Sequence, residues 1–368
     1  MDARYYMPPE WEAHEMTLMA WPDNRDTWPG EKLNRAEHVF ADILEALTPH
    51  EEVSLLVANG QAQQAAAAMI RNRGIDWNRI RLIRMPVNDV WIRDYGPISL
   101  RPTATPAGTE SAGTEAAIHG TGPAAPENKK TVFSNWEYNA WGQKYPPFEA
   151  DNAVPPKLAQ LLNRQLVEPG MVLEGGSIDV NGAGSLLTTE SVLLNPNRNP
   201  GWKKEEITEK LKSFLGAGHV IWLKNGLKGD DTDGHVDDLA RFVSERVIFV
   251  TVTGDKSDPN YDTLRENWNI LREATDVHGR PFEIVELPLP QTRIKDTTVD
   301  GSQYVPASYS NFYIANRCVL VPVYDERYDD EVLRLFQSVF PDRYIKGIPC
   351  KELVWGQGAI HCVTQQVL

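Results

Sequence analysis

The sequence is poor in cysteine and has no long uninterrupted apolar run. Only Cys318, Cys350 and Cys362 occur among 368 residues, and no two of them form a CxxC pair. This pattern predicts neither a disulfide framework nor a zinc finger, and the odd number leaves at least one thiol free. No segment is apolar over the length that a bilayer crossing requires, and the first residues do not resemble a secretory leader. We therefore expect a cytoplasmic protein with no membrane partner.

Positive charge is also scarce. The chain has 37 Lys and Arg residues against 51 Asp and Glu residues, which gives a formal net charge of -14. An excess of carboxylates repels the phosphates of nucleic acids and anionic lipids, so we expect no nucleic-acid partner. The same charge suits a cationic substrate, although acidic surfaces also serve solubility alone. The sequence leaves open whether the chain forms a homo-oligomer.

One stretch, at about residues 103–129, lacks large apolar side chains and consists mainly of Ala, Gly, Thr, Pro and Glu. Such a segment buries too little surface to order itself, which predicts a flexible surface insertion. Strand-like alternation resumes on both sides of it, in residues 91–100 and 131–142, so the insertion is expected to connect two strands of one domain. We therefore interpret residues 1–368 as a single domain.

The rest of the chain alternates between short β-like runs and longer amphipathic runs, which indicates an α/β fold. Strands are predicted where short apolar or β-branched runs end in turn residues: 16–22, 53–58, 80–87, 185–195, 246–252, 282–289 and 318–325. Helices are predicted at 33–49, 61–74, 203–216 and 330–340. The third of these ends at Gly216, where a C-cap glycine is expected.

A small or acidic polar cluster precedes a strand hairpin five times, at spacings of roughly 50 to 80 residues. These segments are residues 88–100, 173–189, 233–250, 307–323 and 356–368. Five such segments suggest a pseudo-symmetric ring in which each hairpin delivers polar side chains to a common axis. The alternative interpretation is that these five segments are ordinary transitions from a loop into a strand.

Cys362 is the candidate nucleophile. It follows Gly356 and Gly358, which allow a ligand to approach closely, and it precedes polar residues that are unusual beside a core cysteine. Its chain neighbour His361 is an obvious candidate for the general base. Adjacent residues on a strand point to opposite faces, however, so the base is expected to come from elsewhere in the chain.

His235 is the better candidate for the base, within the segment GDDTDGHVDDLARFV. If this segment is extended, His235 and Asp237 share one face and present an imidazole beside a carboxylate. A helix is the alternative, because apolar residues here also match a 3.6-residue period. We prefer a hairpin that begins at Gly234. The acidic stretch could also be a solvated turn or a cation-binding loop, although its oxygen spacing does not match a calcium loop.

Two further segments supply candidate carboxylates. Asp94 follows Trp91 in WIRDYGP, and a carboxylate is the matching acceptor for the planar donor fork of a guanidinium. An ion pair between Arg93 and Asp94 at the surface is the simpler alternative. Glu174 precedes two glycines in LEGGSI, where it either orients His235 or occupies a hairpin turn.

Taken together, the chain resembles the agmatine deiminases, in the peptidyl-arginine deiminase-like branch of the pentein superfamily, over nearly its whole length. The resemblance is carried by eight segments in the family's order: MPPEWEAHEMTLMAWP, WIRDYGP, WEYNAWG, LEGGSI, LNPNRNP, TDGHVD, ASYSNFYIAN and GAIHCVTQQ. It implies a five-bladed α/β propeller with the active site on its axis. It also implies hydrolytic deimination of agmatine without a metal or cofactor.

The resemblance implies roles at the matching positions. Cys362 matches the nucleophile, His235 the general acid and base, and Glu174 a third polar catalytic residue. Asp94 and Asp237 match the pair that binds the guanidinium. Trp91, together with Trp136 and Trp141, could line the channel, although core packing explains the last two equally well.

Four positions depart from the family's usual TNGH, VDN and GGGNIHC patterns: Asp233, Asp238, Gln357 and Ala359. Because they lie beside the catalytic positions, they are expected to bear on the distal part of the substrate. Deimination of free or peptide-terminal arginine is therefore an alternative, which Arg198 or Arg241 lining the pocket would favour. A non-catalytic guanidine-binding protein and a metal-dependent protein using His235, Asp237 and Cys362 are alternatives of another class.

Overall fold

The computed structural model describes residues 5–103, 131–291 and 303–368. The predicted insertion, apart from Thr103, lies outside the described residues. The strands that flank it, β5 (Ile98–Pro102) and β6 (Val132–Ser134), pair antiparallel, as expected of two strands of one sheet. No helix in the described part of the chain has the length and apolar character needed to span a membrane.

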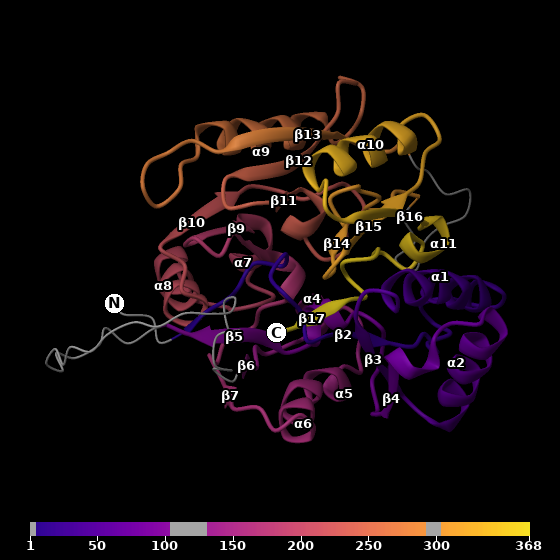
Figure 1. The fold of residues 1–368 in the computed structure, drawn as a ribbon. Helices are drawn as coiled ribbons and strands as arrows, with labels where there is room; N and C mark the ends of the chain where they lie inside the picture. Colours follow the sequence, from indigo (N-terminus) through magenta and orange to yellow (C-terminus); the bar gives the residue numbers. More distant parts are fainter. Residues whose placement is uncertain (1–4, 104–130, 292–302) are drawn as a thin grey trace, which may run out of the picture.

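The strands form five sheets that share one pattern: an antiparallel pair, followed by a third strand parallel to the second. The middle strand and the parallel third strand are joined through helices, which is the usual connection for parallel neighbours. Four sheets are β1 (Tyr5–Tyr6), β5, β6 and β7 (Leu166–Val167); β8 (Ile178–Val180), β9 (Ser185–Thr189) and β10 (His219–Leu223); β11 (Ala240–Phe242), β12 (Val247–Val252) and β13 (Glu283–Pro288); and β14 (Tyr313–Ile314), β15 (Cys318–Val323) and β16 (Tyr344–Pro349). Figure 1 shows the sheets following one another around the molecule in chain order.

The fifth sheet joins the two ends of the chain. It contains β17 (Gln365–Val367), β2 (Met16–Ala20), β3 (Glu52–Val57) and β4 (Ile80–Arg84), and β17 pairs antiparallel with β2 through Gln365 and Leu18. The α/β class and the five-part repeat expected from the sequence are therefore both present.

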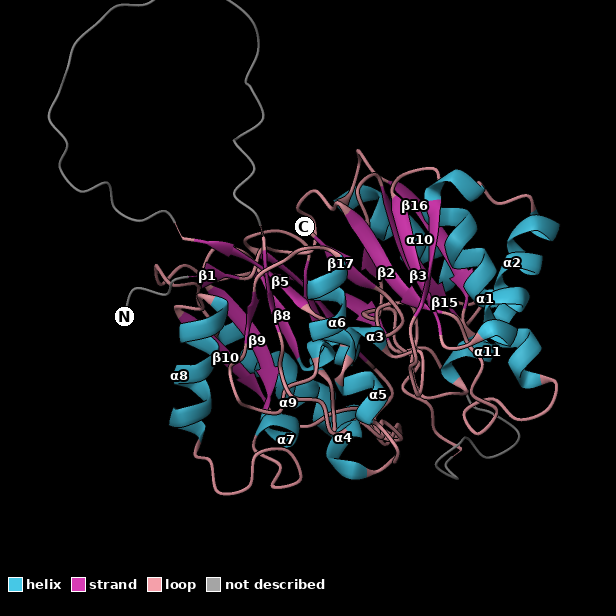
Figure 2. Cartoon of the chain, turned by 90° about the horizontal axis from the view of Figure 1, so that it is seen from below, coloured by secondary structure: helices cyan, strands magenta, loops and turns pink. Residues whose placement is uncertain are grey.

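Helices cover the outer sides of the sheets (Figure 2). The longer ones are α1 (Lys32–Leu47), α2 (Gly60–Arg73), α6 (Val154–Leu161), α8 (Lys204–Leu215), α9 (Tyr261–Glu273) and α10 (Asp329–Val339). The short ones are α3 (Ile92–Tyr95), α4 (Ala140–Gln143), α5 (Glu149–Asn152), α7 (Glu190–Leu193), α11 (Lys351–Val354) and the 3₁₀ turns η1 (Trp77–Arg79), η2 (Gly175–Ser177) and η3 (Val236–Asp238).

The four predicted helices are confirmed to within two residues at each end, and Gly216 caps α8 with a φ of 70°. The strand predicted at 185–195 was too long, because α7 begins at Glu190. Four polar residues, Thr188 to Ser191, separate the apolar residues of β9 from those of α7, and this break in the apolar run marks the change from strand to helix.

Candidate active site

The loops that lead into the first strand of each hairpin converge on one region. Cys362 precedes β17 and is 6% exposed. A Cβ atom added to Gly358 would lie 2.4 Å from the Trp91 ring and 3.1 Å from Cys362 Cβ. Gly358 therefore packs directly between the indole and the cysteine, and a larger residue at this position would separate them.

His235, Asp237 and Asp94 meet around Gly176. A Cβ atom at Gly176 would lie 2.6 Å from His235 Nδ1, 2.9 Å from Asp237 Oδ2 and 2.9 Å from Asp94 Oδ1. The extended conformation predicted for residues 235–237 is wrong, because Val236–Asp238 form a 3₁₀ turn that His235 caps. The prediction that His235 and Asp237 lie over one site nevertheless holds, since the turn is tight enough to keep both side chains beside Gly176.

Asp94 lies in α3 and is 5% exposed, so it is not part of a surface ion pair with Arg93. Its Oδ1 accepts a hydrogen bond from Gly176 N at 3.0 Å, and its Oδ2 accepts one from Trp141 Nε1 at 2.9 Å. Burial, together with the charge of Glu174, raises the pKa of Asp94 to about 7. The two hydrogen bonds act in the opposite direction because they favour the carboxylate.

Trp141 reaches Asp94 from an unusual turn. Four consecutive residues from Ala140 to Gln143 have positive φ, between 51° and 88°. Only glycine adopts this region without strain, so the turn must be held by its surroundings. Asn139 accepts a hydrogen bond from Gly142 N and donates one to Asn197 O at 2.9 Å. Trp136, by contrast, packs against Phe214 in a separate core, which agrees with the core-packing alternative and not with a place in the channel.

Glu174 is fully buried, but it does not orient His235 through a described hydrogen bond. Its Oε1 accepts from Arg198 Nε at 2.6 Å, and Arg198 Nη1 also pairs with Asp233 Oδ2 at 2.6 Å. Asp233 in turn binds Lys144 Nζ at 2.7 Å. Glu174 therefore acts on this region mainly through its charge, which contributes to the raised pKa of Asp94.

Several buried polar atoms in the site have no hydrogen-bond partner among the described residues. They include Glu174 Oε2, His235 Nε2 and Asp237 Oδ1. An unsatisfied buried polar group costs roughly 1–3 kcal/mol, so buried groups are normally paired. Two of these atoms belong to residues predicted as catalytic and the third to a residue predicted to bind the guanidinium, which indicates a place where a polar ligand completes the hydrogen bonding.

Burial sets the protonation states of the free site. It raises the pKa of the Cys362 thiol well above its ordinary value, and the charges of Asp237, Asp238 and Asp94 add to this effect. Burial also lowers the pKa of His235 well below its ordinary value, with a further contribution from Arg198. At neutral pH the cysteine is therefore a thiol and the histidine a neutral imidazole.

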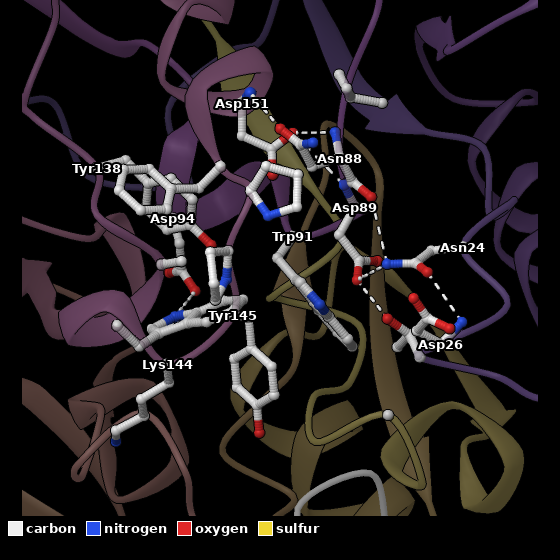
Figure 3. A pocket seen from close by; sticks show the side chains of 18 of the residues that line it. Asn24, Asp26, Asn88, Asp89, Trp91, Asp94, Tyr138, Lys144, Tyr145 and Asp151 are labelled. Atoms are coloured by element: carbon white, nitrogen blue, oxygen red, sulfur yellow. Dashed lines mark hydrogen bonds between the residues drawn. The ribbon is translucent and has the colours of Figure 1, made fainter.

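Cys362, Asp94 and Trp91 line a cavity of about 810 Å³. Figure 3 shows Trp91 between Asp94 on one side and Asp89 on the other. The wall includes six aspartates: Asp23, Asp26, Asp89, Asp94, Asp151 and Asp231. Its basic residues are Arg25, which is exposed, and Lys144. Neither Arg198 nor Arg241 is among the described residues that line it, because Arg198 is paired as above and Arg241 pairs with Glu10 and Asp179.

Of the four positions that depart from the family pattern, only Gln357 lines this cavity. Asp238 and Ala359 are buried, and Asp233 is engaged by Lys144 and Arg198. The expectation that all four lie near the distal part of the substrate is therefore not met.

One residue in contact with the site, Asn311, and one contact, between Trp141 and Asp94, were not foreseen from the sequence. Asn311 Nδ2 lies 3.2 Å from Cys362 Sγ, and Trp141 binds Asp94. The recurrent pattern did include the segment 307–323, so a polar residue just before its first strand was a signal that could have identified Asn311. Within the described residues, no group of three or more His, Cys, Asp or Glu side chains is arranged to hold a metal ion.

Comparisons with known proteins show the family to which the chain belongs. The Porphyromonas-type peptidyl-arginine deiminase family matches residues 6–367. A protein of Legionella pneumophila (strain Paris), provisionally named an agmatine deiminase, is 35% identical over 98% of this chain and 95% of its own length. The structure of the agmatine deiminase of Enterococcus faecalis is similar with a TM-score of 0.84, at 30% identity over 99% of this chain and 96% of its own. A substrate-bound agmatine deiminase of C. jejuni has a TM-score of 0.82 at 27% identity, over 99% and 96% of the two chains. The chain belongs to the Porphyromonas-type peptidyl-arginine deiminase family.

Proposed function

We propose that the protein hydrolyses agmatine to N-carbamoylputrescine and ammonia, with Cys362 as the covalent nucleophile. The observation that carries the proposal is the group of buried, unpartnered atoms of Glu174, His235 and Asp237, which adjoins Asp94 beside a cavity that contains the thiol. A planar cation with several N–H donors is the ligand that satisfies such acceptors. The expected setting is the cytoplasm, where the product leads towards putrescine.

In the proposed complex, Asp94 and Asp237 bind the guanidinium and hold its carbon over Cys362 Sγ. Asp237 Oδ1 is available for this role, and the two carboxylates meet at Gly176. Trp91 and Trp141 pack along the methylene chain. The bound cation also lowers the pKa of the thiol, because it offsets the surrounding carboxylates. Binding thus prepares the nucleophile that burial otherwise keeps protonated.

The first half-reaction forms a C–S bond and breaks a C–N bond. The thiol proton passes to His235, and the thiolate attacks the guanidinium carbon to give a tetrahedral adduct. The imidazolium then protonates the terminal amino group, which leaves as ammonia. An amidino group linked to Cys362 through sulfur remains.

The second half-reaction is hydrolysis. His235 takes a proton from water, and the resulting hydroxide attacks the amidino carbon. Collapse of this adduct breaks the C–S bond and releases the ureido product. The thiolate regains a proton from His235, and the remaining hydroxyl proton goes to solvent.

The cavity favours a substrate with an amine at its distal end. Apart from Asp94, which is assigned to the guanidinium, and Asp151, whose pKa burial raises to about 8, the wall carries four aspartates, whereas the carboxylate of arginine would call for a basic partner. Lys144 is already bound to Asp233, which leaves the exposed Arg25 as the lining residue that supports the arginine alternative. An assay of ammonia released from agmatine and from arginine, run side by side, separates the two substrates. Faster turnover of arginine would overturn the assignment.

The covalent step is tested by acid-quenching the enzyme during turnover and digesting it. We expect a mass increase on the peptide that contains Cys362, and none in C362S. The buried Cys318 and Cys350 serve as internal controls, since they share the chain but lie outside the site. An adduct on either of their peptides, without one on Cys362, would contradict the mechanism.

A further inference from the structure

Asn311 is a fully buried amide in direct contact with the thiol. It lies just before β14, in the fourth of the converging loops, and its side-chain Nδ2 is 3.2 Å from Cys362 Sγ. The same Nδ2 donates to Asp238 Oδ1 at 3.0 Å. An amide nitrogen has two N–H donors, so it can satisfy both acceptors at once.

The surroundings determine which way the amide faces. Oδ1 of Asn311 accepts a hydrogen bond from His361 N at 2.9 Å, and a main-chain N–H can only donate. Asp238 Oδ1 requires a donor when it is ionised. Rotating the amide by half a turn would place nitrogen against the His361 N–H, and this bond would be lost whatever the protonation state of Asp238. The donor side therefore faces the sulfur.

The sulfur needs such a donor because its other neighbours oppose its ionisation. Asp237, Asp238 and Asp94 all act against the thiolate, and its burial adds to their effect. A hydrogen bond to the ionised form favours that form. In the thiol form the contact can reverse, because Sγ–H can donate to Asn311 Oδ1 at 3.6 Å.

We propose that Asn311 is a catalytic residue that stabilises the Cys362 thiolate by an N–H hydrogen bond to sulfur, with Asp238 and the His361 main chain fixing the direction of the amide. The proposal rests on Cys362 as the nucleophile, but it concerns the free enzyme. Asp238 is a positioning residue in this arrangement. It occupies one of the positions at which this chain departs from the family pattern.

The test is alkylation of Cys362 by iodoacetamide across a range of pH, in the absence of agmatine, read from the mass of the Cys362 peptide. The reagent is neutral, so the acidic cavity does not repel it, and it reacts with the thiolate. We expect N311A to react about tenfold more slowly than the wild type on the acidic side of the profile. The difference in alkylation rate between N311A and the wild type should disappear as the pH rises.

N311D is the second variant, because it keeps the side-chain volume and replaces the donor with an acidic group. N311D should displace the pH profile of Cys362 alkylation to higher pH at least as far as N311A does. If N311A does not fold, the profile of N311D alone tests the role of Asn311. S310A is the matched control: Ser310 Oγ binds Thr251 Oγ1 at 2.8 Å, and its alkylation profile should match that of the wild type.

Profiles of N311A and N311D that coincide with that of S310A would overturn the role of Asn311. Because no substrate is present, such a result would leave the agmatine assignment standing. Conversely, loss of the agmatine assignment in the ammonia assay would not alter the alkylation result.

Discussion

The imidazole of His361 and the carboxylate of Asp237 lie 2.6 Å apart, from Nδ1 to Oδ2. His361 is the chain neighbour of the nucleophile, yet it contacts Asp237 and not the sulfur. Its Nε2 lies 2.9 Å from Glu10 Oε2, so the ring bridges two carboxyl groups. A neutral imidazole has a single N–H, and burial raises the pKa of Asp237. The bridge formed by His361 therefore holds the Asp237 carboxyl group between Glu10 and the site.

The first prediction concerns this bridge. H361A should lower kcat/KM by about 100-fold, because Asp237 loses the group that orients it and guanidinium binding depends on close alignment. H361N should retain more activity than H361A, since an asparagine amide can occupy the position of Nδ1. Steady-state kinetics at one pH, with thermal unfolding to verify folding, provide the comparison. Equal activity in H361A and the wild type would exclude a role for the bridge.

The second prediction concerns Trp141 and the pH profile. Because kcat/KM reports the free enzyme and the pKa of Asp94 is raised to about 7, activity should fall as the pH drops below about 7 and Asp94 becomes protonated. W141F removes a hydrogen bond that favours the carboxylate. The acidic limb of the profile should therefore move to higher pH, and kcat/KM on this limb should fall about tenfold.

W136F is the matched control for this substitution. Trp136 Nε1 donates to Ser134 Oγ at 3.0 Å within a core away from the site. The control should change stability without moving the acidic limb. If both variants moved it equally, the indole of Trp141 would have no special part in setting the charge of Asp94.

The third prediction concerns Gly176. In G176A the added methyl group would press on His235 Nδ1, Asp237 Oδ2 and Asp94 Oδ1 at distances no longer than 2.9 Å. Activity should fall by about 100-fold or more, because all three groups must shift. Gly254 has nothing within 4 Å of the same position, so G254A should retain activity. Full activity of G176A would show that the three side chains are not held as described.

The fourth prediction concerns stability. Burial alone would raise the pKa of Glu10, but Arg241, His361 and Arg93 together lower it well below the ordinary value. A carboxyl group whose pKa is depressed on folding stabilises the protein above the pKa of the unfolded chain. That contribution disappears as the pH falls through the folded value. E10A should therefore lower the free energy of unfolding by about 3–5 kcal/mol at neutral pH.

Denaturant unfolding at neutral and at acidic pH measures this effect. The difference between E10A and the wild type should shrink at acidic pH. Glu15 is 49% exposed in its pair with Arg164, and E15A should cost at most about 1 kcal/mol. A cost for E10A as small as that for E15A would contradict the importance of the buried pairs.

Much of the fold could be predicted because its signals are local. The helices α1, α2, α8 and α10 follow amphipathic patterns, and Gly216 marks the end of one of them. The change from strand to helix at Glu190 was missed because apolar residues resume immediately after the polar residues 188–191, which made the two elements resemble one long strand. The pairing of β17 with β2 was likewise not derivable from local pattern, since it joins the two ends of the sequence.

The candidate site likewise contains residues that the sequence identified and contacts that it did not. Residue type and family motif identified Cys362, His235 and the aspartates. They did not identify Asn311 or the contact between Trp141 and Asp94, because these depend on loops distant in sequence. Glu174 was expected to orient His235, yet its described partner is Arg198. Only the three-dimensional arrangement could distinguish these partners.

The pairing of β17 with β2 has a consequence for how the protein is made. Leu18 leaves the ribosome long before Gln365 is synthesised, so the edge of β2 has no partner during most of translation. An unpaired strand edge invites association with other chains, and contacts between such distant residues form slowly. Cys362, which precedes β17, is synthesised equally late. A nascent chain therefore carries no working active site before β17 pairs with β2.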